Sequence, residues 1–257
     1  MSANRKILGM RVDSTNYNDA TKKVIEWSND NQGRYICIST VHMIMEGYDN
    51  PKYQIIVNNA DLVTPDGMPL VWMLKALGVK DQQRVYGPDL TLHVCAAAEK
   101  QCIPVGFYGG MPASLSDLTI NLQAKYPKLK IVYSHSPPFR PLTPEEDNAV
   151  VQAINASGAR ILFVGLGCPK QERWAAEHKG KVNAVMLAVG AAFDFHSGRV
   201  KQAPNWIQKA GMEWFFRLLM EPKRLWKRHL KHNPRFIALA LLQLLKYKLN
   251  FKGVQTP

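Results

Sequence analysis

The stretch 160–174 constrains the fold of this chain more than any other feature. It opens with four consecutive apolar residues, 161–164, a pattern typical of a strand buried on both faces. Gly165 and Gly167 follow, and they let the backbone turn sharply and approach a ligand with no side chain in the way. Pro169 stands where a helix begins, because its missing N–H costs nothing there. A strand, a glycine turn and a helix in this order favour an anion such as phosphate, although the turn alone leaves that contact open.

The same order of strand, turn and helix recurs along the whole chain. Apolar runs predict strands at 6–12, 34–39, 61–64, 104–108, 129–133, 161–164 and 182–189. Helical patterns separate these strands. Helices are predicted from about Asn18, over 41–59 and over 68–77, and three more are predicted to begin at Asp89, at Pro112 and at the Thr143/Glu146 capping box. This alternation predicts an α/β fold, a doubly wound, mostly parallel Rossmann-like sheet with ligands at the carboxyl ends of its strands.

Positive charge is concentrated in the C-terminal segment. Residues 199–257 hold 13 Lys/Arg and two acids, so they carry +11 of the net charge of +13 and leave +2 for the first 198 residues. Pro204, Pro222 and Pro234 each fit the first turn of a helix. Basic helices rich in aromatic residues commonly lie in a membrane interface. We therefore predict a catalytic α/β domain at 1–198 and a helical, membrane-docking appendage at 199–257.

The cysteines and the apolar runs exclude several classes of protein. Cys37, Cys95, Cys102 and Cys168 form no C-x-x-C pair and have no histidine at ligand spacing. They indicate buried or incidental thiols in a reducing compartment, and neither a zinc site nor a disulfide framework. The N-terminus lacks the apolar core of a secretory signal. The longest apolar run, 236–245, would rise about 15 Å as a helix, half of a hydrocarbon core of about 30 Å. We expect no membrane-spanning helix.

Several glycine-ended turns follow predicted strands, at 64–67, 108–110, 165–167 and 190–194. Because the carboxyl ends of parallel strands meet at one edge, these turns are expected to line one rim of the sheet. Such convergence strengthens the prediction of an anion site there.

Asp66 is the acid with the clearest chemical position. It lies just past a strand, between Pro65 and Gly67, where a stiff loop could hold a general base. It could equally cap the helix that begins near Met68, and the residues alone leave both roles open. Asp194 has the same two roles open, contact with ribose hydroxyls or capping.

Arginines are the natural partners for a diphosphate in this chain. No Asp-x-Asp occurs, so the usual means of holding a metal on a nucleotide diphosphate is missing, and no metal is expected. The planar guanidinium matches phosphate oxygens. Arg84, Arg217, Arg224 and Arg228 are the candidates, and Arg224 and Arg228 share a helix face. The alternative is an ordinary solvated basic face.

The motifs together resemble the WecG/TagA/CpsF family of glycosyltransferases, which transfer a sugar from a nucleotide sugar to a polyprenyl-diphosphate-linked acceptor in bacterial surface-polymer assembly. They run in order over about 7–235 and comprise the segments 64–68 (Thr-Pro-Asp-Gly-Met), 84–90, 165–174, 190–195, 198–204 and 213–226.

This resemblance implies a metal-independent, inverting transfer without a cofactor, from a UDP-sugar. Asp66 would be the catalytic base, with Arg84 as the second catalytic residue. The substrate-binding residues would be Ser39, Thr40, His42, Gly109, Gly110, Gly165, Gly167, Lys170, Gln171, Asp194 and Gln202. Arg217, Arg224 and Arg228 would bind the diphosphate and the acceptor. The resemblance also implies a cytoplasmic enzyme, peripheral on the inner face of the cell membrane, with an anionic lipid surface as partner; a homo-oligomer stays open.

One segment departs from the family pattern. Where the family commonly reads Asn-Thr-x-Asn, this chain has Ser39-Thr40-Val41-His42. Because these positions are expected near the donor, a glucose-type or other UDP-hexose donor is open beside the N-acetylmannosamine type.

Two other classes of protein share parts of the pattern. An NAD-type oxidoreductase has the same sheet and glycine turns, but it would carry G-x-G-x-x-G in the first βα unit, which is missing here. A basic module that binds nucleic acid or a lipid surface without catalysis would account for the charge of 199–257. We expect no nucleic-acid partner.

Overall fold

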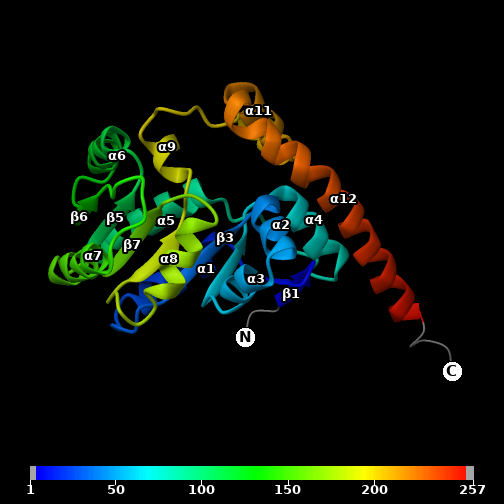
Figure 1. Ribbon diagram of the computed structural model, residues 1–257, viewed down its shortest axis with the longest axis horizontal. Helices are drawn as coiled ribbons and strands as arrows, with labels where there is room; N and C mark the ends of the chain where they lie inside the picture. Colours follow the sequence, from blue (N-terminus) through cyan, green and yellow to red (C-terminus); the bar gives the residue numbers. More distant parts are fainter. Residues whose placement is uncertain (1–3, 253–257) are drawn as a thin grey trace.

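The computed structural model describes residues 4–252, and its centre is a six-stranded parallel sheet (Figure 1). The strand order is β4-β3-β8-β7-β5-β6, and every neighbouring pair is parallel. The strands are β3 (Tyr35–Ser39), β4 (Leu62–Pro65), β5 (Val105–Gly109), β6 (Ile131–His135), β7 (Ile161–Gly165) and β8 (Val185–Ala188). The prediction of a doubly wound, mostly parallel α/β sheet is confirmed.

Helices cover both faces of this sheet, because the strand side chains alternate between two apolar cores. On β3, Ile36 and Ile38 belong to one core, while Tyr35 and Cys37 belong to the other. The first core is completed by α1 (Tyr17–Trp27), α5 (Gly87–Lys100), α6 (Pro112–Lys125) and α9 (Ala192–His196). The second is completed by α2 (Val41–Asp49), α3 (Pro51–Asn58), α4 (Met68–Ala76), α7 (Pro144–Ala156) and α8 (Lys170–Glu177).

The prediction of one strand at 6–12 is wrong. The chain makes a hairpin of β1 (Asn4–Ile7) and β2 (Met10–Asp13), an antiparallel sheet of its own. Leu8 and Gly9 have φ of 49° and 86°, the left-handed conformation that a two-residue hairpin turn requires. The pattern of apolar residues continued across this turn, so the sequence did not mark it.

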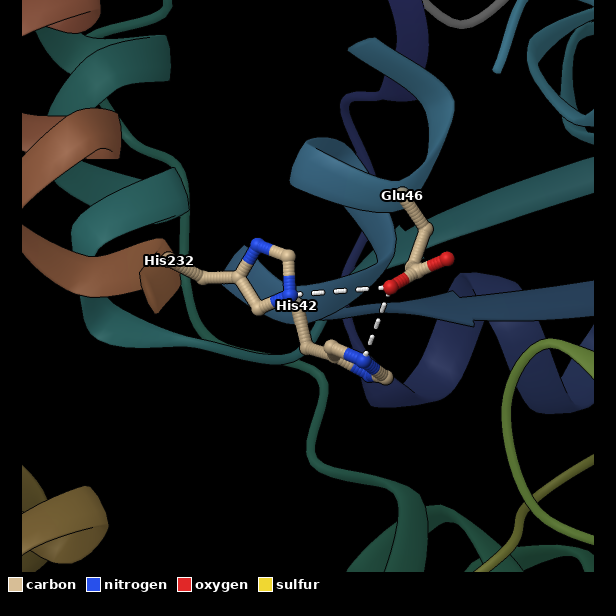
Figure 2. Close-up of side chains that lie close together, drawn as sticks. All are labelled: His42, Glu46 and His232. Atoms are coloured by element: carbon tan, nitrogen blue, oxygen red, sulfur yellow. Dashed lines mark ion pairs between the residues drawn. The ribbon is translucent and has the colours of Figure 1, made fainter. Parts of the chain in front are cut away.

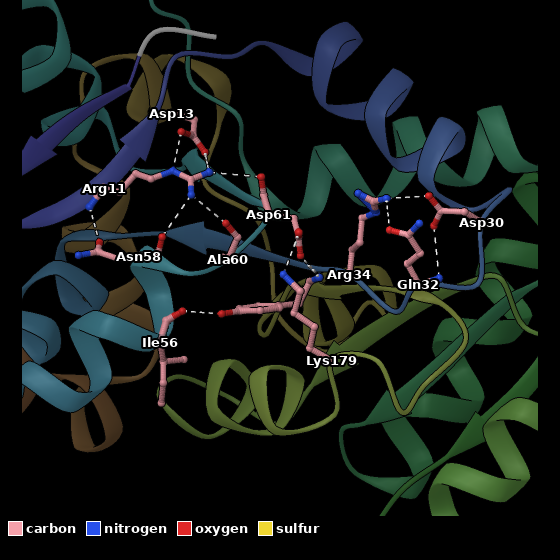
Figure 3. Close-up of polar contacts among 11 residues, drawn as sticks. Arg11, Asp13, Asp30, Gln32, Arg34, Ile56, Asn58, Ala60, Asp61 and Lys179 are labelled. Atoms are coloured by element: carbon pink, nitrogen blue, oxygen red, sulfur yellow. Dashed lines mark hydrogen bonds and ion pairs between the residues drawn. The ribbon is translucent and has the colours of Figure 1, made fainter. Parts of the chain in front are cut away.

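Arg11 attaches this hairpin to the edge of the main sheet (Figure 3). Its guanidinium lies 2.7 Å from Asp13 and donates to the carbonyl of Ala60 at 2.9 Å. Asp13 in turn accepts from the backbone N–H of Val63 on β4 at 2.8 Å. Asp61 extends the network, since it accepts from Lys179 at 2.9 Å. The network satisfies polar groups at the amino end of β4, away from the glycine turns.

Three helix boundaries differ from the expected ones. The segment 41–59 is two helices, because Asn50 accepts from Tyr53 N at 3.1 Å and caps α3. The N-cap of α5 is Tyr86, so Asp89 lies in the first turn and accepts from the Tyr17 hydroxyl. Pro169 is the N-cap of α8 and not its first residue. The capping box of Thr143 and Glu146 at α7 is confirmed.

The C-terminal segment contains α10 (Asn205–Lys209), α11 (Glu213–Met220) and α12 (Pro222–Lys252), and α12 extends well past the sheet in Figure 1. Pro204 and Pro222 stand at helix starts as expected, but Pro234 lies inside α12. Leu225, Phe236 and Ala240 are buried on either side of it, and this packing offsets the roughly 3 kcal/mol cost of an interior proline. No helix among residues 4–252 is both long and apolar enough to cross a bilayer. The last residues of the predicted appendage, 253–257, lie outside the described residues.

Candidate active site

A cleft of about 1810 Å³ opens at the carboxyl ends of the strands. The helix after β3 packs on one face of the sheet, whereas the helix after β8 packs on the other. Neighbouring connections that diverge in this way leave a crevice at the strand ends, where α/β proteins bind their ligands. Residues of α10, α11 and α12 also line this cleft, so the C-terminal helices complete it.

Most of the candidate site residues line this cleft. They are Thr40, His42, Asp66, Arg84, Gly110, Gly165, Gly167, Lys170, Gln171, Asp194, Arg217, Arg224 and Arg228. Ser39, Gly109 and Gln202 do not line it. The Ser39 side chain is fully buried, with its hydroxyl 4.0 Å from the Met10 sulfur, and Gln202 is exposed.

Gly109 is required by packing between strands. Its φ is +118°, and a Cβ there would stand 2.6 Å from the backbone of Gly165 on the neighbouring β7. Gly165 is equally confined, because its Cβ would stand 2.7 Å from the Phe193 ring. The two glycines let β5 and β7 end close together, under the floor of the cleft.

The amides of the glycine turns are partly engaged within the protein. Gly167 N–H donates to Gln171 Oε1 at 3.1 Å, and Gly110 N–H donates to the Gly165 carbonyl at 3.0 Å. Space next to Gly167 is open, since a Cβ there would meet nothing within 4 Å. The glycine turn at 165–167 therefore lets a ligand approach the backbone closely, but its Gly167 N–H is already bonded within the protein.

Glu172 is a buried acid that sequence reasoning missed. It accepts from Gln171 Nε2 at 2.8 Å and from the Tyr53 hydroxyl at 3.1 Å. Burial raises the pKa of this carboxyl to about 6. Gln171 also donates to the Ala188 carbonyl at 3.0 Å, so Glu172 fixes the amide that organises the glycine turn.

Asp66 forms the centre of a charged group at the rim. Its Oδ1 accepts from Arg84 Nη2 at 3.0 Å, and its Oδ2 accepts from Gly87 N–H at 3.2 Å. Arg84 Nε donates to the Asp66 carbonyl as well. The N-cap of α4 is Gly67 with no side-chain cap, so the alternative role of Asp66 as the cap of the helix beginning near Met68 is wrong.

Glu213 of α11 completes this group from the C-terminal segment. Its carboxylate lies 2.6 Å from Arg84 Nη2, and Gln208 Oε1 accepts from Arg84 Nη1 at 3.2 Å. The guanidinium also stacks over the Tyr86 ring, with Cζ 4.0 Å from the ring centre. Sequence reasoning missed Glu213, although it is one of two acids in a strongly basic segment.

Burial raises the pKa of Asp66 to about 6, with Glu213 adding to the rise and Arg84 opposing it. Burial lowers the pKa of Arg84, but the charges of Asp66 and Glu213 and their hydrogen bonds outweigh it and hold this pKa above the ordinary value. At neutral pH the group is therefore an ionised carboxylate held in place by a guanidinium and an amide. A carboxylate whose pKa is near the working pH is suited to take a proton.

Arg217, Arg224 and Arg228 bring positive charge to the same cleft from α11 and α12. Glu221 lies 2.5 Å from Arg224 and 3.8 Å from Arg217. The Nε atoms of Arg217 and Arg228 are buried without a hydrogen-bond partner in the structure. Burial and the two other arginines lower the pKa of Arg228 to about 10. Three guanidiniums near two carboxylates, Glu221 and Asp194, leave an excess of positive charge that an anion would neutralise.

Asp194 lies near this cluster. It is in the first turn of α9, and burial raises the pKa of its carboxyl, while Arg224 and Arg217 oppose the rise. It lines the cleft and makes no side-chain cap of α9. It can therefore accept hydrogen bonds from a ligand hydroxyl.

The His42 ring lies close to α12, with its centre 5.3 Å from the centre of the His232 ring. Its Nε2 lies 3.4 Å from Glu46, which is also approached by His232. Among the described residues, these three form the one group of His, Cys, Asp or Glu side chains whose ligand atoms are close enough to share a metal ion.

The sequence matches a known family model over nearly its full length. Residues 5–250 match the model described as the glycosyl transferase WecG/TagA/CpsF family. A relative from Bacillus spizizenii is 30% identical over 213 residues, which cover 82% of this chain and 80% of the relative. That relative is described as N-acetylglucosaminyldiphosphoundecaprenol N-acetyl-beta-D-mannosaminyltransferase. The matched residues include both sides of the cleft.

Proposed function

Since this chain belongs to the WecG/TagA/CpsF family of glycosyltransferases, we propose that it transfers a hexose or N-acetylhexosamine from a UDP-sugar to a polyprenyl-diphosphate-linked saccharide. The observation that carries this proposal is the single cleft that combines the Asp66 carboxylate with an arginine cluster that has too few acidic partners. Attack on the sugar carbon requires a base, and departure of the diphosphate requires an anion site in the same cleft.

Asp66 is proposed as the base. The acceptor hydroxyl loses its proton to the Asp66 carboxylate while its oxygen bonds to the anomeric carbon of the donor. The bond from that carbon to the diphosphate oxygen breaks, and the electron pair leaves with UDP. One displacement of this kind inverts the configuration at the anomeric carbon. Arg84 and Gly87 N–H hold the carboxylate, and Glu213 holds Arg84 in turn.

Arg217, Arg224 and Arg228 are proposed to stabilise the leaving diphosphate. Charge grows on its oxygens as the bond breaks, and a preorganised cationic cluster stabilises that charge most in a partly dry cleft. The buried, unpaired Nε atoms of Arg217 and Arg228 support this role. With arginines in this position the reaction needs no metal ion on the diphosphate, and we expect no gain in rate from added Mg²⁺ or Mn²⁺.

The acceptor is proposed to be membrane-linked, which fits a protein that docks on the inner face of the membrane through its C-terminal helices. The described relative acts on a diphosphoundecaprenol-linked N-acetylglucosamine, so a lipid-linked N-acetylglucosamine is the first acceptor to test. The donor sugar is less constrained, because His42 stands next to the cleft wall at the position where this chain departs from the family pattern.

A donor screen tests the proposal directly. The full-length protein is incubated with a short-chain prenyl-diphosphate N-acetylglucosamine and, in turn, with radiolabelled UDP-sugars of the glucose, N-acetylglucosamine and N-acetylmannosamine types. We expect one donor to give a lipid-extractable disaccharide, with Asp66→Asn as the inactive control. Label that reaches no lipid product with any donor, while the protein binds UDP, would contradict the proposal.

A further inference from the structure

Three potential metal ligands from two helices meet at the contact between α2 and α12 (Figure 2). His42 and Glu46 lie one turn apart on α2, and His232 comes from α12, almost two hundred residues later. The Nε2 atoms of both histidines are directed at the same carboxylate oxygen, Glu46 Oε1, at 3.4 Å and 3.5 Å. All three ligand atoms lie within 4.8 Å of one another.

These separations are long for hydrogen bonds and suitable for ligands of one ion. An N–H···O hydrogen bond is typically about 2.9–3.0 Å long. Two ligand atoms that each lie about 2.1 Å from a tetrahedral zinc ion are separated by about 3.4 Å, the length of a tetrahedron edge. The two His–Glu separations match that edge. Two of the three separations therefore have the length expected for ligands of one zinc ion.

The surrounding charges leave Glu46 as the carboxylate for the ion. Asp49, the next acid on α2, is occupied, because it lies 2.7 Å from Arg235 and 3.8 Å from Lys231. Within residues 4–252, Glu46 forms ion pairs with the two imidazoles and with no lysine or arginine.

We propose that His42, Glu46 and His232 bind one Zn²⁺ ion that fastens α12 to α2. Two imidazoles and a carboxylate are a ligand set that zinc prefers, and a water completes the tetrahedron. Both histidines line the cleft, so the water position opens toward it. The ion would fix the part of α12 that carries Arg224 and Arg228, but it would not contact the donor diphosphate. This inference does not depend on the proposed transferase activity.

Zinc binding by the untagged, full-length protein is the test. Zn²⁺ is titrated in competition with a chromophoric chelator at pH 7, and we expect one ion per chain with micromolar or tighter affinity. His42→Gln, Glu46→Gln and His232→Gln should each weaken binding about tenfold or more, since even the loss of groups around a zinc ligand has such an effect. His229→Gln is the matched control, one turn from His232 on α12, and should bind as the unaltered chain does.

Cobalt and hydrogen exchange distinguish this site from adventitious binding. Co²⁺ held by two imidazoles and a carboxylate gives the visible bands of a tetrahedral ion without a thiolate charge-transfer band, which would instead indicate a cysteine ligand. Zn²⁺ should slow amide exchange of α12 around residues 225–240 in the unaltered chain and in His229→Gln, and not in His232→Gln. Far-UV circular dichroism verifies that each variant is folded, and Glu46→Gln replaces His232→Gln if the latter unfolds.

The proposal is overturned by any of three results. These are the absence of measurable binding, equal affinity in the folded ligand variants and the unaltered chain, or a thiolate spectrum. A loss in His229→Gln as large as that in His232→Gln would overturn the assigned ligand set.

Discussion

At the scale of single residues, the chemistry of the cleft depends on how Asp66 is held. A buried carboxylate next to a guanidinium usually has a low pKa, but here desolvation and the charge of Glu213 outweigh Arg84, and the pKa rises to about 6. Arg84 is therefore shared between two acids, one after β4 and one on α11. The proposed base and the C-terminal helices are coupled through one guanidinium.

Asp66→Asn should lower the rate of transfer by about 10²–10⁴-fold, the typical contribution of a positioned general base. The amide keeps the size of the side chain but cannot take the acceptor proton. UDP binding, measured by calorimetry, should stay within a few-fold, because the diphosphate is assigned to the arginines. Asp117→Asn, an exposed acid that pairs with Arg199, is the control. Turnover of Asp66→Asn at the rate of the unaltered chain would eliminate the proposed base.

The pH profile should report the same carboxylate. Transfer requires ionised Asp66, so kcat/KM should fall as pH drops below about 6. The stability effect has the opposite sign: the raised pKa means that the folded state binds this proton more tightly than the unfolded chain. The resulting stabilisation is complete below the ordinary value of 3.8 and is lost as pH rises through about 6.

Glu213→Gln should move the acidic limb of kcat/KM to lower pH. Its charge raises the pKa of Asp66, so an uncharged glutamine should let that pKa fall. A residue that only packs would change the rate without moving the limb. The control is Glu145→Gln, which changes the net charge equally at an exposed position on α7. An unmoved limb in Glu213→Gln would exclude this positioning role.

At the scale of elements, α12 is held to the α/β core by polar contacts along its length. Arg235 forms an ion pair with Asp49 of α2, and Gln243 bonds the β1–β2 hairpin through Leu8 N–H and the Lys6 carbonyl. Phe236 and Ala240 bury apolar surface between these contacts. Together they position a helix that carries two of the cleft arginines.

Thr143→Ala should lower the free energy of unfolding by about 1 kcal/mol, within a usual range of about 0.5–2 kcal/mol for an N-cap. Thr143 Oγ1 accepts from Glu146 N–H, and the Glu146 carboxylate accepts from Thr143 N–H. The substitution removes the first of these two bonds and keeps the backbone donor of the second. Urea denaturation measures the change. Thr119→Ala, which removes a hydroxyl bonded within α6, should cost clearly less; equal costs would show that the cap is not formed in solution.

At the scale of the whole molecule, the C-terminal helices present large apolar side chains to solvent beside many cations. Trp206, Leu219 and Leu230 are 72%, 61% and 69% exposed. Basic helices with such residues commonly lie in a membrane interface. The surface they form, on α10, α11 and α12, also borders the cleft, which would bring a lipid-linked acceptor to Asp66.

Leu219→Ala combined with Leu230→Ala should weaken binding to anionic vesicles by about tenfold or more, because each substitution removes apolar area that the lipid would bury. Vesicle co-sedimentation at fixed salt measures the change. Ile55→Ala with Ile120→Ala removes comparably exposed side chains, 59% and 62%, from α3 and α6 and should bind as the unaltered chain does. Equal losses in both pairs would contradict membrane docking through the C-terminal helices.

The sequence by itself determined the sheet, its helices and most of the rim. The spacing of apolar residues and the residues of turns and caps are local signals. Ile161 to Val164 therefore predicted β7, and Thr143 with Glu146 predicted the start of α7. Asp66 and the arginines could be named because motifs of this kind are contiguous. The hairpin turn at Leu8 was missed, since nothing in its apolar pattern breaks there.

Only the tertiary structure decided which distant groups meet. Pro234 is a helix start by local rules, but packing on both sides of it keeps α12 continuous. Glu213 reaches Arg84, and His232 reaches Glu46, across gaps of more than a hundred residues. Sequence pattern describes neighbours along the chain, whereas contact, burial and the resulting pKa depend on neighbours in space. The α/β fold therefore followed from the sequence, and the coupling of its rim to the C-terminal helices followed from the packing.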